Sequence, residues 1–245
     1  AWDFAQGEDV IISVIDSGVE VDHADLKNQV VDGYDAFSDT AGSKAGDASR
    51  LNYLMSSYKH GTHVAGIIAA EANNKSSIAG IAPKAKIMPV KIFPDFDDYF
   101  QTSRQTADDE QVTTSAIMSD AIVWSVDHGA NIINMSLIMN YESVTVERAV
   151  QYAIEHDVTV IVAAGNQRHI DNARNTLAAI EGVIAVGATD QGNNITSFSN
   201  SGDYHENSIQ ISLLSFLPRL IVRASPTRSG ASRKGQPWAL RWLRR

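Results

Sequence analysis

Short runs of branched apolar residues alternate along the chain with stretches of helical period. The first run, residues 10–15, is almost unbroken, which is typical of a strand buried on both faces of a parallel sheet. Similar runs follow at residues 87–93, 131–136, 158–164 and 183–188, and helical patterns separate them at 61–72, 113–128 and 144–156. The alternation predicts an α/β fold, with a doubly wound, mostly parallel sheet and helices on both faces.

Two polar insertions and a different C-terminal segment interrupt this rhythm. The insertions, at about 35–57 and 95–111, carry Asp, Ser, Thr and Gly without clear periodicity, so we expect surface loops. After Tyr204 the chain is first apolar with interspersed Arg, then rich in Arg, Ser, Gly and Pro. We therefore expect one globular domain over residues 1–204 and a disordered or partly helical tail over 205–245.

The charge changes at the same boundary. Residues 1–204 hold 12 Lys and Arg against 28 Asp and Glu, a net charge of −16, whereas residues 205–245 hold 8 against 1, a net charge of +7. Nucleic-acid binding needs clustered Lys and Arg, so the acidic body argues against a nucleic-acid partner.

The compartment is not fixed by composition. The sequence has no Cys, which excludes disulfides and thiolate metal sites but does not separate a reducing from an oxidising compartment. The first residues lack the basic-then-apolar pattern of a signal peptide, and no run of about 18 apolar residues predicts a membrane span. If the protein is secreted, we expect its leader to have been removed.

Three polar residues are expected to converge at one edge of the sheet. Asp16 ends the first apolar run, Asn166 follows the fourth, and His60 precedes the first helical pattern. In open α/β sheets, ligands bind outside the carboxyl ends of the strands. A histidine oriented by a buried carboxylate can act as a general base, and a side-chain amide can stabilise an oxyanion. Gly61 has no side chain, which would allow a substrate to approach closely.

Each of these residues also has a simpler interpretation. An Asp before Ser-Gly at a strand end is often a turn or cap residue, and Asn166 after Gly165 could be a left-handed turn residue. His60 and His63 could form a metal-binding pair, although no third ligand is signalled at zinc-like spacing. The joint occurrence of Asp16, His60 and Asn166 favours catalysis.

Longer motifs carry a resemblance to a known family. Three segments stand in a characteristic order: Val14-Ile15-Asp16-Ser17-Gly18, His60-Gly61-Thr62-His63-Val64-Ala65-Gly66 and Ala163-Ala164-Gly165-Asn166. Further agreement comes from Gly80-Ile81-Ala82-Pro83, Pro89-Val90-Lys91, Ile133-Asn134-Met135-Ser136-Leu137, Ile184-Ala185-Val186-Gly187-Ala188 and Ser197-Phe198-Ser199-Asn200. Over residues 1–204 the chain resembles the subtilisin family of serine peptidases, the subtilases.

The resemblance implies a catalytic role for the three converging residues. Asp16 would orient the base, His60 would be the general base and acid, and Asn166 would help to form the oxyanion hole. His63 would be a packing residue. The fold implied is the subtilisin-like α/β sheet, here incomplete at its C-terminal end.

The resemblance also implies binding sites. Ser136 and Leu137 would lie on a strand that pairs with an extended polypeptide substrate. Asp25 and Asn74 match positions that bind a structural calcium ion in many relatives, and oxygen ligands suit that cation. The alternative is that both are loop residues without an ion. No organic cofactor is implied, and we expect an extracellular or cell-envelope monomer.

Two departures from the family pattern weigh against ordinary activity. The family carries its nucleophile in a Gly-Thr-Ser turn, and no Gly-Thr-Ser occurs between Asn166 and Arg245. Ser229 and Ser232 in the basic tail are poor substitutes. Ile138 and Met139 stand where the family usually has two glycines, so we expect their side chains to intrude on the primary specificity pocket.

Three functional hypotheses follow. The first is a subtilisin-like serine endopeptidase whose chain is truncated or frame-shifted near residue 205, where the motif and the acidic residues disappear together, and which is inactive as written. The second is a non-catalytic peptide-binding pseudoprotease. In the third, a separate chain supplies the missing serine helix. We also expect marginal folding, because absence of that helix would leave apolar sheet surface uncovered.

Overall fold

The computed structural model describes residues 2–48, 59–75, 78–94, 107–171, 174–201 and 211–214. In this part of the chain, eight strands form one sheet in the order β3-β2-β4-β1-β5-β6-β7-β8. Only β2 and β3 pair antiparallel; all the other neighbours are parallel. The strands are β1 (Ile11–Asp16), β2 (Gly33–Asp35), β3 (Thr40–Gly42), β4 (Lys86–Lys91), β5 (Ile132–Met135), β6 (Thr159–Ala163), β7 (Ile184–Thr189) and β8 (Ile211–Leu214).

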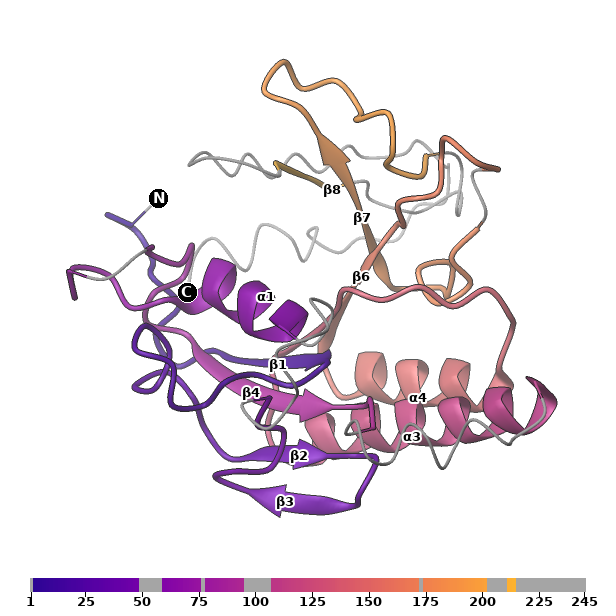
Figure 1. Cartoon of the computed structure of the whole chain (residues 1–245), viewed down its shortest axis with the longest axis horizontal. Coiled ribbons are helices and arrows are strands. Elements are labelled where there is room, and N and C mark those ends of the chain that lie inside the picture. The colour runs from indigo at the N-terminus through magenta and orange to yellow at the C-terminus, as the bar shows by residue number, and fades with distance from the viewer. Residues whose placement is uncertain are drawn as a thin grey trace, which may run out of the picture.

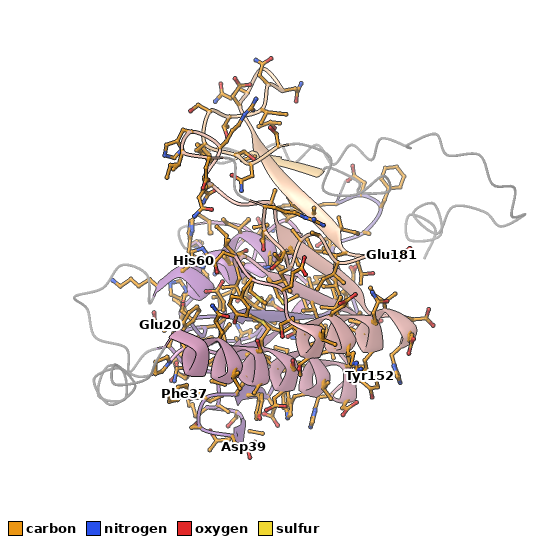
Figure 2. All side chains as sticks on the ribbon, turned by 90° about the vertical axis from the view of Figure 1, so that its right-hand side faces the viewer. Glu20, Phe37, Asp39, His60, Tyr152 and Glu181 are labelled. Carbon is orange, nitrogen blue, oxygen red and sulfur yellow. The ribbon has the colours of Figure 1, made fainter. Side chains whose placement is uncertain are left out.

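Helices cover both faces of the sheet (Figure 2). Helix α1 (His60–Ala69) packs on one face, where its Ala65 and Ala69 contact the apolar side chains of β1 and β4. Helices α3 (Ala107–Asp127) and α4 (Val144–Glu155) pack together on the opposite face, over the larger apolar core. The predicted α/β fold, doubly wound and mostly parallel, is therefore confirmed.

The predicted strands and helices lie close to where the structure has them. The five apolar runs became β1, β4, β5, β6 and β7. Helix α4 begins after Ser143, whose hydroxyl accepts a hydrogen bond from the amide of Val146, as an N-cap residue should. Helix α1 ends at Ala69, earlier than expected, because Ala70 takes an extended conformation.

Three strands were not predicted, and one helix begins earlier than expected. Strands β2 and β3 form an antiparallel pair at one edge of the sheet, and β3 lies within the segment expected to be a surface loop. Helix α3 begins at Ala107, inside the second expected loop. This start was not predicted because the first turns of the helix are polar. Strand β8 pairs in parallel with β7 beyond residue 204, where no strand was expected. Figure 1 shows β7 and β8 at the far end of the sheet from β3.

The two faces of the central strands differ in burial. On β5 and β6, side chains that face α3 and α4, such as Met135 and Val162, are buried. Their neighbours on the other face, including Asn134, Ile161 and Ala163, are only half-buried. Because successive residues of a strand point to opposite faces, this alternation shows that α1 covers β1 and β4 more completely than β5 and β6.

Candidate active site

Asp16 lies at the carboxyl end of β1, almost completely buried at 1% exposure. Its carboxylate accepts a hydrogen bond from the amide of Ser17, at 2.7 Å, and both of its oxygens face the imidazole of His60. A buried carboxylate is tolerated only when it is paired and hydrogen-bonded. Asp16 therefore serves as the acceptor of its own turn and also as the partner of His60.

His60 is the first residue of α1, and Figure 2 shows it on the α1 side of the sheet. Its Nδ1 lies 2.9 Å from Oδ1 and 2.8 Å from Oδ2 of Asp16, which fixes Nδ1 as the hydrogen-bond donor. In the neutral ring Nε2 is then unprotonated. The side chain is 48% exposed, and within the described residues its hydrogen bonds are those to Asp16.

The pKa of His60 is raised above its ordinary value. The main cause is the hydrogen bond to Asp16; partial burial opposes the shift, and the charge of Asp16 adds to it. The carboxylate stabilises the imidazolium that forms when His60 takes up a proton. This arrangement suits a base that must become transiently protonated during a reaction.

Gly61 allows α1 to approach the turn after β1. A Cβ atom at Gly61 would lie 2.3 Å from the carbonyl oxygen of Gly18 and 3.0 Å from the Cβ of Asp16. The amide of Gly61 also donates to the hydroxyl of Ser17, at 3.1 Å. Gly61 was expected to make room for a substrate. In the structure, the group that approaches it is this backbone turn, so the glycine serves the contact between Asp16 and His60.

Asn166 lies in the turn that leaves β6, and its side chain is exposed. Gly165 takes the left-handed conformation, with φ of +112°, whereas Asn166 is not among the residues with positive φ. The simpler interpretation of Asn166 as a left-handed turn residue is therefore wrong. Strands β1, β5 and β6 run parallel, so this turn and Asp16 both lie at the carboxyl ends of the strands.

Ser136 and Leu137 follow β5 at its carboxyl end and are half-buried. A buried residue that the sequence analysis missed, Asn175, fixes their path. Its amide donates to the carbonyls of Leu137 and Ala163, at 2.8 and 2.7 Å, and its side-chain oxygen accepts from the amide of Met139, at 3.0 Å. Asn175 thus ties the segment after β5 to the end of β6.

Ile138 and Met139 do not behave alike. Met139 is 5% exposed and belongs to the core beneath α3 and α4, and its intrusion on the specificity pocket stays a prediction. Ile138 is 42% exposed, and its Cδ1 lies 3.6 Å from the place that a Cβ of Gly165 would take. Of these two residues, Ile138 is the one that presents an exposed apolar side chain beside the Asn166 turn.

Two other expectations concerned metals and packing. His63 is exposed on α1, although it was expected to pack. In the described residues no group of three His, Cys, Asp or Glu side chains could hold a metal ion, so the structure gives no support to a metal site at His60 and His63.

Asp25 and Asn74 lie in contact. The carboxylate of Asp25, 2% exposed, accepts a hydrogen bond of 2.8 Å from the side-chain amide of Asn74. Turning that amide by half a rotation would place its oxygen beside the carboxylate. A carboxylate and an amide carbonyl are oxygen donors of the kind that calcium prefers, so the pair fits a calcium ion chemically.

The chain has relatives among proteins of known sequence. A model of the Subtilase family matches residues 7–215. A thermophilic serine proteinase of Bacillus sp. (strain AK1) is 38% identical over 208 residues, which are 83% of this chain and 44% of that protein. The major intracellular serine protease of Bacillus subtilis (strain 168) is 33% identical over 199 residues, 80% of this chain and 56% of that protein.

The fold has relatives among solved structures. The crystal structure of fervidolysin from Fervidobacterium pennivorans, described as a keratinolytic enzyme related to subtilisin, superposes with a TM-score of 0.66 at 33% identity. The match covers 85% of this chain and 29% of that one. The chain thus spans less than two thirds of the length of each of these relatives. The family match and the shared fold together show that the chain belongs to the subtilase family.

Proposed function

We propose that residues 1–204 form the part of a subtilisin-like serine endopeptidase that carries its base and its oxyanion turn. The observation that supports this most directly is the contact between buried Asp16 and half-exposed His60. In this proposal Asp16 orients the imidazole, Nε2 of His60 takes a proton from the nucleophile and returns it to the leaving group, and the Asn166 side chain donates to the oxyanion.

We further propose that the 245-residue chain does not cleave peptides by itself. The mechanism needs a serine whose hydroxyl reaches Nε2 of His60, and the sequence after Asn166 has no Gly-Thr-Ser. In subtilisin, a member of this family, removal of the serine lowers turnover by about 10⁶-fold. The seven Arg residues between Arg219 and Arg245, beyond the end of the family match, support a reading-frame shift. Resequencing the gene tests this, because a shift requires Gly-Thr-Ser in another frame.

A second candidate is a pseudoprotease that binds peptides without cutting them. It is favoured by the segment around Ser136 and Leu137, because Asn175 holds this segment in place whether or not a nucleophile is present. An extended polypeptide would add to the segment as a strand, with backbone hydrogen bonds providing affinity.

One experiment separates these candidates. The full chain is incubated with peptides from digested casein, and retained and released peptides are identified by mass spectrometry. Uncut peptides retained by the chain support peptide binding, and Ser136→Pro should abolish retention because it removes a backbone N–H needed for strand pairing. New cleavage that disappears in His60→Ala would contradict the proposed inactivity. A folded chain that retains no peptide would contradict the pseudoprotease.

We also propose a structural calcium ion at Asp25 and Asn74. The ion would join the loop after β1 to the loop after α1, which already meet through the amide of Glu71 and the carbonyl of Asp25, at 2.9 Å. Calcium needs six to eight oxygen ligands, so backbone carbonyls and water would complete its shell.

The partner and the compartment are proposals as well. We propose a monomer that has polypeptides as its partners, lies outside the cell or in the cell envelope, and does not bind nucleic acid. None of the helices in the described residues is long and apolar enough to cross a membrane. Because one relative is named as an intracellular protease, fractionation of the source cells is the test of location.

A further inference from the structure

The turn after β6 is closed around one buried side chain, that of Asn200. Asn200 is 2% exposed, although it lies in a segment without regular secondary structure. Its side-chain oxygen accepts a hydrogen bond of 2.7 Å from the amide of Gln167, and its side-chain amide donates to the carbonyl of Ala164, at 3.2 Å. These bonds hold the turn on both sides of Asn166.

The backbone of Asn200 adds a third contact. Its amide donates to the carbonyl of Gly165, at 2.9 Å. The residues on either side of Asn166 are thus bound to Asn200 through Gly165 and Gln167, while the Asn166 side chain remains exposed. An exposed amide on a turn would ordinarily sample several directions, but here the peptide groups that flank it are fixed.

Gly165 and Asn200 are sterically matched. A Cβ atom at Gly165 would lie 2.5 Å from Nδ2 of Asn200, closer than real Cβ contacts allow. Gly165 also has φ of +112°, a conformation that residues with a side chain rarely adopt. The turn therefore requires glycine both for its own conformation and for the approach of Asn200.

Asn200 is itself anchored to the sheet. The preceding residue, Ser199, is 1% exposed; its hydroxyl accepts from the amide of Ala188 on β7, at 2.9 Å, and contacts the carbonyl of Asn200, at 3.2 Å. The amide of Ala164 donates to the carbonyl of Val186, also on β7, at 2.8 Å. Both sides of the turn, at Ala164 and at Ser199, are therefore hydrogen-bonded to the same strand, β7.

We propose that Asn200 is a positioning residue that sets the direction of the Asn166 side chain by holding both of its flanking peptide groups. This role rests on the proposed function, in which Asn166 donates to an oxyanion. Such a donor works only when it is fixed in advance, within about 0.5 Å and 10–20° of its productive position. Asn200 would touch no substrate and would act through Asn166.

The test uses nuclear magnetic resonance on the isotopically labelled full chain. In the unmodified chain, a scalar coupling across the hydrogen bond between the Gln167 amide and the Asn200 side-chain carbonyl is expected. In Asn200→Leu, which keeps the size but removes both polar atoms, the Gln167 amide should exchange with solvent about tenfold faster or more. The side-chain amide resonances of Asn166 should shift as well.

Two further variants separate positioning from general stability. Ser143→Ala removes the N-cap of α4, so it weakens the domain but should leave the Asn166 resonances unchanged. Asn200→Asp keeps an acceptor for Gln167 and loses the donor to Ala164, so it should protect the Gln167 amide better than Asn200→Leu does. If Asn200→Leu does not fold, the Asn166 resonances in Asn200→Asp and the coupling in the unmodified chain still test whether Asn200 positions Asn166.

The proposal is overturned if the coupling is absent, or if the Asn166 resonances respond to Ser143→Ala as strongly as to the Asn200 variants. Neither measurement depends on catalysis. A folded chain that retains no peptide in the test above but shows the coupling would contradict the pseudoprotease and leave the role of Asn200 in the turn intact.

Discussion

The imidazole of His60 and the carboxylate of Asp16 are held together across 44 residues of sequence, with Nδ1 at 2.8 and 2.9 Å from the two carboxylate oxygens. Replacing Asp16 by Asn removes the hydrogen-bonded charge that raises the pKa of His60. We predict that the pKa of His60 falls in Asp16→Asn. Titration of the histidine resonances measures it, and His128 and His156 in the same spectra are internal controls.

The same contact makes stability depend on pH. A raised folded-state pKa means that the folded chain binds the proton more tightly than the unfolded chain does. The stabilisation should be fully present below the pKa of His60 in the unfolded chain, about 6.5. It should be lost as the pH rises through the raised pKa of His60 in the folded chain. Denaturant unfolding between pH 5 and pH 9 should show this loss in the unmodified chain but not in Asp16→Asn. An identical pH profile in the two chains would refute the assignment.

Helix α1 offers a matched pair of glycine substitutions. A Cβ at Gly61 would collide with the backbone of Gly18, so Gly61→Ala should destabilise the domain by about 1–3 kcal/mol and move His60 away from Asp16. The nearest atom to a Cβ at Gly66 is Ile78 Cδ1, at 3.5 Å, an ordinary contact. Gly66→Ala should therefore be neutral or stabilising by about 0.5–1 kcal/mol. Urea denaturation compares them, and equal losses would contradict the steric account.

Lys91 ends β4 beside Asp16 and forms a buried ion pair with Asp35, at 2.8 Å, with Lys91 only 3% exposed. Lys91→Met leaves the carboxylate of Asp35 without this cation and should cost about 3–5 kcal/mol of unfolding free energy. Exposed pairs contribute little, so Lys84→Met, which breaks the pair with Glu8, is the control. The double variant Asp35→Leu/Lys91→Met should recover much of the loss. Similar melting of Lys91→Met and Lys84→Met would show that the buried pair is unimportant.

Calcium at Asp25 and Asn74 should stabilise the folded chain. At a free concentration about a hundred times the dissociation constant, a single ion adds about 2.7 kcal/mol, so the melting temperature should rise with calcium and fall with a chelator. Asp25→Ala should remove this response, whereas Asp190→Asn in an exposed loop should retain it. A response that survives in Asp25→Ala would place the ion elsewhere.

Much of this fold could be predicted because apolar runs mark buried parallel strands, and β1 and β4 to β7 follow such runs. Strands β2 and β3 could not be predicted in this way. They are three residues long and contain Gly, Asp and Thr, so β2 depends on its pairing with β4, and β3 on its pairing with β2, rather than on their own pattern. The first turns of α3 were missed for a similar reason, because Asp108-Asp109-Glu110 resembles a solvated loop.

The residues of the candidate site also differ in whether a local sequence pattern predicts them. Asp16, His60 and Asn166 lie in local motifs, so the sequence alone could single them out. Asn175 could not be found from a local pattern, because it is a single polar residue whose partners are distant in sequence. Asn200 lies in the motif Ser197-Phe198-Ser199-Asn200, but that motif does not reveal its contacts with Ala164 and Gln167. Their role becomes visible only when burial and hydrogen bonds are known together.

We propose that this chain holds His60 as an oriented base without a serine nucleophile. Incubation of the purified 245-residue chain with a fluorophosphonate serine probe, followed by intact-mass measurement, tests this beside the His60→Ala variant. We predict that the folded chain remains unlabelled, while His60 still titrates with its raised pKa. Covalent labelling that disappears in His60→Ala would show that a serine in this chain is activated and would contradict the proposed absence of a nucleophile.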